Sequence, residues 1–348
     1  MINNYNIIKY IVLLLIFIYC SNSSENKIKE YNTINYYPDI YISKEYIFNN
    51  EGLNKPWLIK ENQLGEVIVL DVGNLCFYVF SKEGKYLRSF SRIGQGPGEM
   101  LEPRYFDIDY EGNIYLIDNG NKRISIFNSK GVFISSFRIE NISRNTRIRV
   151  NKNKELLINI PQNGYFITVF SNSGKIIRQV AKLPEEIINM KNFIEIAGFA
   201  HIFMDNNNNY YIFEEALLRL EVYDIDGKII KQTNIDELLQ IPIWRKNYIP
   251  PNNPGNTKFQ SCSEDIIMKY DKYYLINKEI PSDLRNVKIL NVFVIDFNLK
   301  LINKYVLNLN EGLNLQGNYG IRFDVIENGK TVLLPLVKNG EIILFNSK

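Results

Sequence analysis

Histidine is almost absent from this chain of 348 residues, which contains one, His201. A single imidazole cannot build a zinc site of several histidines, and no cluster of cysteines accompanies it. No Gly-x-Ser-x-Gly string is present to support a Ser-His-Asp arrangement. We therefore interpret His201 as a polar group of an inner β-strand. Cys76 and Cys262 could pair, but their spacing does not demand it, and we expect buried thiols.

Long apolar runs are also missing. The longest, Tyr10–Tyr19, has ten residues, too few to cross a bilayer as a helix. Lys9 precedes it and Cys20 follows, the order of a secretory signal. Phe17 to Cys20 resembles a bacterial lipobox, although Tyr19 is bulky where small residues are usual.

These features predict a signal peptide over residues 1–19 and a lipid on Cys20. A signal cleaved elsewhere, or a retained apolar segment, are the alternatives. Residues 20–39 would be a flexible tether, and residues 40–348 a single domain, since no linker divides them. We expect a lipid-anchored protein of the bacterial cell envelope, at the outer membrane or in the periplasm.

No large excess of charge exists, because 41 Lys and Arg oppose 38 Asp and Glu. Removing residues 1–19 takes away one basic residue and leaves 40 minus 38, or +2. Basic residues interleaved with aromatic ones do not cluster. We therefore expect no nucleic-acid partner.

The sequence does contain a repeat: a hydrophobic strand, a tight polar turn usually closed by glycine, and a second strand. Its copies are YVFSKEGKYL (Tyr78–Leu87), SIFNSKGVFI (Ser125–Ile134), TVFSNSGKII (Thr168–Ile177), EVYDIDGKII (Glu221–Ile230), the fainter FVIDFNLKLI (Phe293–Ile302) and the truncated LFNSK (Leu344–Lys348). Equivalent positions 80, 127, 170, 223, 295 and 345 are 47, 43, 53, 72 and 50 residues apart by subtraction. Such a period is typical of propellers, whose blades have four strands, A to D.

Six copies predict an all-β, six-bladed β-propeller. An open β-solenoid is the alternative, but solenoids have shorter and more uniform periods. The sixth unit provides strands A (323–326), B (331–337) and C (341–345) and lacks strand D. We predict that residues 40–48 fill this position and close the ring, because an open blade would leave an unpaired edge.

Ser91–Met100 (SRIGQGPGEM) connects the first two units and is the most distinctive string. It is not a phosphate loop, because no helix and no cationic cradle follow. With Gly94, Gly96, Pro97, Gly98 and Glu99, the six units and the N-terminus, the chain over residues 40–348 resembles the six-bladed β-propeller lipoproteins of Bacteroidetes, relatives of NHL-repeat propellers. The resemblance implies the fold and export, and most of that family has no assigned activity.

In a propeller the B-to-C loops and D-to-A crossings share one face, and the A-to-B and C-to-D hairpins share the other. The long insertions, 181–197, 236–264, 278–286 and 308–320, all fall on the first face. Loops on a rigid scaffold concentrate binding, so we expect recognition there. The candidate ligand-binding residues are Arg92, Glu99, Arg104, Tyr105, Arg123, Trp244 and Arg245.

Two functions remain open. We favour a non-enzymatic binding or scaffold module that recognises a glycan, a peptide or an envelope protein. The alternative is a metal-assisted hydrolase or lyase acting at the central channel, like the lactonase and amidating-lyase relatives of NHL propellers. Channel calcium would need Asp107, Asp109, Asp205 or Asp324, but Asp107 and Asp109 share one face of one strand. We therefore expect no cofactor.

Overall fold

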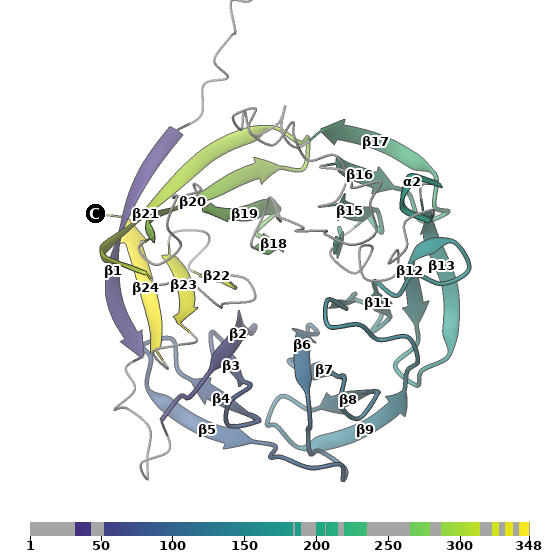
Figure 1. Cartoon of the computed structure of the whole chain (residues 1–348), viewed down its shortest axis with the longest axis horizontal. Coiled ribbons are helices and arrows are strands. Elements are labelled where there is room, and N and C mark those ends of the chain that lie inside the picture. Colours follow the sequence, from purple (N-terminus) through teal and green to yellow (C-terminus); the bar gives the residue numbers. More distant parts are fainter. Residues whose placement is uncertain are drawn as a thin grey trace, which may run out of the picture.

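The strands form six four-stranded blades arranged around a central channel (Figure 1). This computed structural model describes residues 32–42, 52–183, 185–188, 200–205, 207–214, 219–234, 265–278, 287–313, 322–326, 331–336 and 341–347. A six-bladed β-propeller was predicted from the repeats, and that prediction is confirmed.

The first three blades are regular antiparallel sheets. Blade 1 contains β2 (Pro56–Glu61), β3 (Val67–Asp71), β4 (Cys76–Phe80) and β5 (Tyr86–Phe90); blade 2 contains β6 (Pro103–Ile108), β7 (Ile114–Asp118), β8 (Arg123–Phe127) and β9 (Phe133–Arg138); blade 3 contains β10 (Ile148–Val150), β11 (Leu156–Ile158), β12 (Tyr165–Phe170) and β13 (Ile176–Lys182). Strand B of blades 1 and 2 is buried along its whole length. Such strands are continuous apolar runs because a neighbouring blade covers each face.

The last three blades complete the ring. Blade 4 contains β14 (His201–Met204), β15 (Tyr210–Glu214), β16 (Arg219–Tyr223) and β17 (Ile229–Asn234); blade 5 contains β18 (Asp265–Lys269), β19 (Lys272–Lys278), β20 (Val287–Asp296) and β21 (Leu301–Leu313); blade 6 contains β22 (Asp324–Ile326), β23 (Thr331–Leu336), β24 (Glu341–Ser347) and β1 (Asn32–Ile42). Hydrophobic clusters join adjacent blades across the ring. The core is therefore a set of layers between blades, and some of its side chains, such as Tyr105 and Phe203, also line the channel.

The N-terminal strand β1 closes the ring, as predicted. Its second half pairs antiparallel with β24, with Ile40 opposite Ile343. Its first half pairs parallel with β21, with Asn32 opposite Asn303. Blades 5 and 6 consequently form one continuous eight-stranded sheet, with β1 on its outer side (Figure 1).

The bounds of this strand differ from those predicted. We placed it at 40–48, whereas β1 occupies 32–42 and includes part of the segment expected to be a tether. Pro38 lies inside β1 but beyond the residues paired with β21, so β1 has a neighbour there on one side only. A proline without an N–H is tolerated in such a position.

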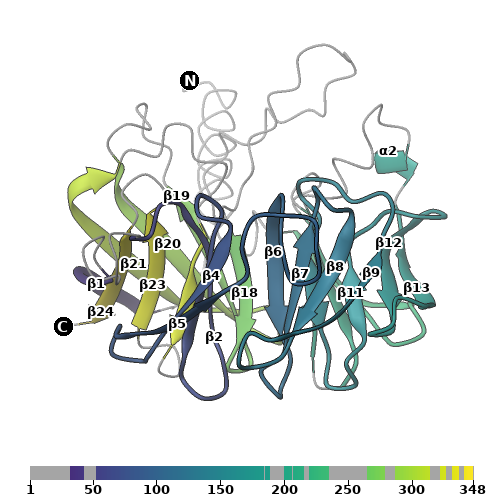
Figure 2. The same ribbon diagram turned by 90° about the horizontal axis from the view of Figure 1, so that it is seen from below.

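Figure 2 shows the ring from the side, with the short helix α2 (Glu185–Ile188) at one end of the barrel-like body. This helix lies in the crossing from blade 3 to blade 4. The expected insertion at 308–320 begins instead as strand, because β21 continues to Leu313. Residues 236–264 and 279–286 lie outside the described part of the chain, as does Cys262. Cys76 is half-buried rather than buried.

None of the helices in the described part of the chain is long and apolar enough to span a membrane. The expected signal peptide and Cys20 lie outside that part.

Candidate functional site

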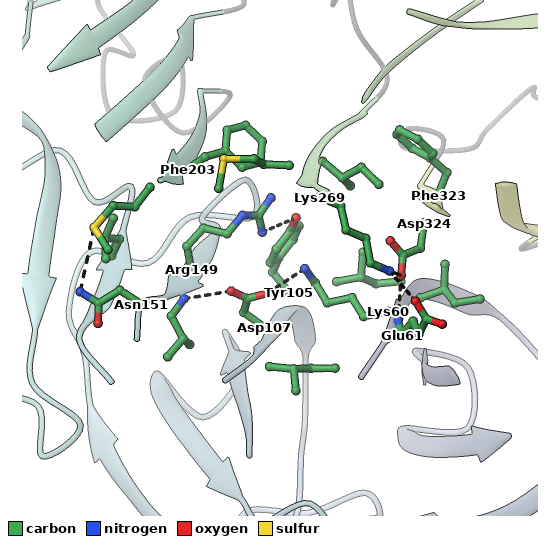
Figure 3. A pocket seen from close by; sticks show the side chains of 18 of the residues that line it. Lys60, Glu61, Tyr105, Asp107, Arg149, Asn151, Phe203, Lys269, Phe323 and Asp324 are labelled. Atoms are coloured by element: carbon green, nitrogen blue, oxygen red, sulfur yellow. Dashed lines mark hydrogen bonds and ion pairs between the residues drawn. The ribbon is translucent and has the colours of Figure 1, made fainter. Parts of the chain in front are cut away.

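A cavity of about 260 Å³ occupies the central channel and is lined by strand A of every blade. In blades 1 to 5 most lining residues come from the second half of strand A, so on that side the cavity lies toward the end of the channel where the A-to-B turns are; in blade 6 they are Phe323 and Asp324, at the start of β22. We expected the recognition surface at the opposite end, where the D-to-A crossings lie. Six charged side chains line the cavity (Figure 3): Lys60, Glu61, Asp107, Arg149, Lys269 and Asp324.

One ion pair links the first three blades. Lys60 Nζ lies 2.7 Å from Asp107 Oδ1. The other oxygen of Asp107 accepts a hydrogen bond of 2.9 Å from the backbone N–H of Val150. The carboxylate is therefore neutralised and held in place by its own neighbours.

A second group links blades 5, 6 and 1 and has an excess of negative charge. Lys269 Nζ lies 3.0 Å from Glu61 Oε2 and 3.1 Å from Asp324 Oδ2. Asp324 Oδ2 also accepts the backbone N–H of Glu61, at 2.7 Å. Burial lowers the pKa of Lys269, but Asp324 and Glu61 outweigh burial and raise it above its ordinary value. One ammonium thus serves two carboxylates.

Arg149 on β10 has no such carboxylate among the residues that the structure describes. Its guanidinium lies between two aromatic rings, 5.2 Å from the centroid of Tyr105 and 4.8 Å from that of Phe203. Nη1 donates to the Tyr105 hydroxyl at 2.8 Å. The residue is 9% exposed, and no carboxylate of the described residues forms an ion pair with it. A buried cation without an ion-pair partner favours an anionic ligand.

Tyr105 is surrounded by positive charge. Burial raises the pKa of its hydroxyl, but Arg149, Lys60 and Arg147 together outweigh burial and hold the pKa below its ordinary value. The Arg147 guanidinium lies 5.6 Å from the centroid of the Tyr105 ring. The cavity wall at blades 2 and 3 is therefore electropositive.

The other end of the channel holds a buried cluster of Arg147, His201 and Asp265. Arg147 Nη1 lies 3.2 Å from Asp265 Oδ1, and Arg147 Nη2 lies 3.2 Å from His201 Nε2. A guanidinium carries no acceptor, so Nε2 accepts and the ring is neutral. Burial, followed by the charges of Arg147 and Arg322, holds the pKa of His201 well below its ordinary value. His201 is thus a neutral, buried polar group of an inner strand.

Three predicted residues, Arg92, Glu99 and Arg123, come together in the first crossing, outside the cavity lining. Glu99 Oε2 accepts the N–H of Gly96 at 2.9 Å, and Glu99 Oε1 lies 2.9 Å from Arg92 Nε. Arg123 Nη2 donates to the carbonyl oxygens of Gly96, at 2.8 Å, and Glu99, at 2.7 Å. The polar contacts given above join these three side chains to the crossing and not to the cavity.

Of the remaining predicted residues, Tyr105 lines the cavity. Arg104 pairs with Glu102, and its carbonyl oxygen accepts the Trp57 indole N–H at 2.9 Å. Trp244 and Arg245 lie outside the described residues.

The carboxylates considered for a channel cation divide into two kinds. Asp109 and Asp205 cap A-to-B turns, each accepting two backbone N–H groups. Asp107 and Asp324 line the cavity and already bind lysines. The described residues contain no group of three His, Cys, Asp or Glu side chains that could hold a metal ion.

Sequence reasoning missed Lys60, Glu61, Arg149, Phe203 and Lys269. The signal for some of them is the placement of charged residues in otherwise apolar inner strands, as in Arg147-Ile148-Arg149. On a strand, alternate residues share one face, so these charges had to point into the channel.

Comparisons with known proteins agree with the fold. Residues 52–143 match a family model described as a 6-bladed beta-propeller. No curated protein matches the sequence.

Solved structures from three bacteria resemble the chain. A Bacteroides fragilis protein described as exported is 15% identical, with a TM-score of 0.58, over 91% of this chain and 100% of that one. A DUF4221-family member from Bacteroides vulgatus is 11% identical, with a TM-score of 0.56, over 92% and 99%. A catalytically inactive virginiamycin B lyase from Staphylococcus aureus, solved with quinupristin, is 13% identical, with a TM-score of 0.50, over 87% and 98%. Likeness at these identities establishes the fold, and it confirms the resemblance to six-bladed propellers.

Proposed function

We propose that this protein is a binding module whose ligand occupies the cavity of the central channel. The observation that carries this proposal is that all six blades contribute to one cavity, and that its walls combine carboxylates, ammonium groups and a buried guanidinium. Concave sites with a few convergent polar groups are where proteins bind small molecules. The charged groups of the described lining all lie on the inner strands of the ring.

The ligand is polar and about the size of a sugar unit or a short peptide. A cavity of about 260 Å³ admits little more than that. Both donors and acceptors line it, which suits hydroxyl, amide or charged groups. A glycan, a peptide or a segment of an envelope protein would each present such a unit.

The site of action in this proposal is the cell envelope, with Cys20 as the lipid attachment point. The apolar run before Cys20 supports export. A protein of the same fold from Bacteroides fragilis is described as exported. The alternative, a metal-assisted hydrolase or lyase, has no comparable support among the described side chains.

Calorimetric titration of mono- and disaccharides and of di- and tripeptides tests the proposal. Ile267 lines the cavity, so Ile267→Trp should fill part of it and weaken binding about tenfold or more. The matched control is Ile134→Trp on the outer strand β9, where the residue is 53% exposed; it should leave affinity unchanged. Thermal melts of both variants check folding. Binding that Ile267→Trp leaves intact, or no binding by any compound, would contradict the proposal.

A further inference from the structure

The charged groups of the cavity are distributed unevenly between its two walls. Lys269 with Glu61 and Asp324 sums to one negative charge, from one ammonium and two carboxylates. Arg149 on the other wall is one positive charge without a paired carboxylate among the described residues. Figure 3 shows these groups on opposite sides of the cavity.

A neutral pair separates the two charged walls. Lys60 and Asp107 lie between them in Figure 3 and neutralise each other at 2.7 Å. The cavity is therefore a dipole across the channel, with a positive pole at Arg149 and a negative pole at Glu61 and Asp324. Opposite poles in a partly desolvated site select a ligand that carries both charges.

We propose that the cavity binds a zwitterion, the free ammonium and free carboxylate of an amino acid or a short peptide. This inference rests on the proposed function and names its ligand class. The carboxylate lies at Arg149 and the ammonium lies at Glu61.

Arg149 suits the carboxylate by geometry as well as charge. A guanidinium presents N–H donors in a planar fork that matches the two oxygens of a carboxylate. Only Nη1 is engaged by the described residues, with the Tyr105 hydroxyl and the carbonyl oxygen of Ile148. The rings of Tyr105 and Phe203 lie next to the guanidinium, with centroids 5.2 Å and 4.8 Å away.

Glu61 suits the ammonium because only one of its oxygens accepts a hydrogen bond from the described residues. Oε2 accepts from Lys269 at 3.0 Å and from the Tyr270 hydroxyl at 3.2 Å. Among the described residues none donates to Oε1. An ammonium has three donors, so it can reach Oε1 and still bond neighbouring oxygens.

The charge pattern disfavours other small ligands. A neutral sugar can hydrogen-bond at both poles but neutralises the charge of neither, and a sugar acid neutralises the charge of Arg149 alone. A zwitterion satisfies both at once and leaves the cavity without net charge.

The probes are alanine, dialanine and trialanine, titrated by calorimetry into the full chain. The length that binds most tightly reports the separation of the poles. Its N-acetyl and C-amide derivatives should each bind about tenfold or more weakly, because each loses a charge-assisted hydrogen bond at one pole.

Two variants assign each end of the ligand to its pole. In Arg149→Met, the free acid and the amide should bind equally, whereas acetylation should still weaken binding. In Glu61→Gln, acetylation should weaken peptide binding less than it does in the native protein. Amidation should weaken binding as much as it does in the native protein. If Arg149→Met fails to fold, Arg149→Lys keeps the charge but not the fork, and should reduce the preference for the acid.

Equal binding of the peptide and its blocked derivatives would overturn the inference, as would absence of peptide binding. The proposed function fails separately. Sugar binding that is sensitive to Ile267→Trp, with no peptide binding, removes the zwitterion and leaves the channel site intact.

Discussion

The Arg123 guanidinium donates a hydrogen bond of 2.7 Å to the carbonyl oxygen of Glu99. Arg123 begins strand C of blade 2, and Glu99 lies in the crossing that enters the same blade. Two further bonds reach the carbonyl oxygens of Gln95 and Gly96. One side chain therefore bonds three carbonyl oxygens of the glycine-rich crossing.

Replacing Arg123 should destabilise the protein. Arg123→Met should lower the free energy of unfolding by about 2 kcal/mol, since it leaves backbone carbonyls without their charged donor. Arg92→Met is the control, because the Arg92 side chain is 80% exposed and its ion pair with Glu99 is screened by water. Urea denaturation measures both. Equal losses in the two variants would show that the crossing is not held by Arg123.

The blade turns were predictable because their signals are local. Gly84, Gly131, Gly174 and Gly227 close the C-to-D turns with φ between 80° and 85°. In the fainter fifth copy Leu299 takes this position, with φ 61°. Its side chain is 6% exposed within the core of blades 4 and 5, so burial compensates for the strained backbone.

The cavity could not be predicted in the same way. Arg149, Tyr105 and Phe203 come from three blades, and their approach depends on the geometry of the closed ring. The sequence shows that Arg149 is charged, but it does not show that a carboxylate partner is missing. The bounds of β1 were missed because its pairing with β21 is made between distant segments.

Two buried glutamates in blade 4 make the stability depend on pH. Glu214 on β15 is 1% exposed and Glu221 on β16 is 2% exposed. Burial, followed by repulsion from Glu221, raises the pKa of Glu214 to about 8, although Arg219 opposes the shift. The Tyr223 hydroxyl donates to Glu221. The folded protein thus holds a proton on Glu214 that the unfolded chain releases near pH 4.5.

Raising the pH should therefore cost stability. A carboxyl whose pKa is raised on folding contributes fully below its unfolded pKa, and the contribution is lost as the pH rises from about 4.5 to about 8. Glu214→Gln mimics the protonated form, so it should match the native protein at pH 5. At pH 8 the free energy of unfolding of Glu214→Gln should exceed that of the native protein by at least about 1 kcal/mol, since one proton corresponds to about 1.4 kcal/mol per pH unit.

Urea denaturation of both proteins at pH 5 and pH 8 measures this difference. Glu140→Gln is the control, because the Glu140 side chain is 64% exposed. Its stability relative to the native protein should not change between the two pH values. If the stability of Glu214→Gln relative to the native protein were also the same at both pH values, the pKa of Glu214 would not be raised.

The closure of the ring by β1 can be tested with a disulfide. Tyr37 on β1 is opposite Asn346 on β24, and Asn346 is opposite Thr331 on β23. Neighbouring strands lie about 5 Å apart, within the range of a disulfide, whereas a strand two positions away is about 10 Å distant and out of range. Tyr37→Cys with Asn346→Cys should therefore cross-link, and Tyr37→Cys with Thr331→Cys should not.

The native cysteines are replaced by serine in both chains, and peptide mapping by mass spectrometry identifies the bond. The cross-link joins residues 309 apart (346 minus 37), so it removes much of the freedom of the unfolded chain. It should raise the free energy of unfolding by about 2–4 kcal/mol, and reduction should abolish the gain. Cross-linking of the Thr331 pair as readily as the Asn346 pair would mean that β1 does not hold its place beside β24. The edge of blade 6 would then be open, and closure would have to come from the contacts between blades alone.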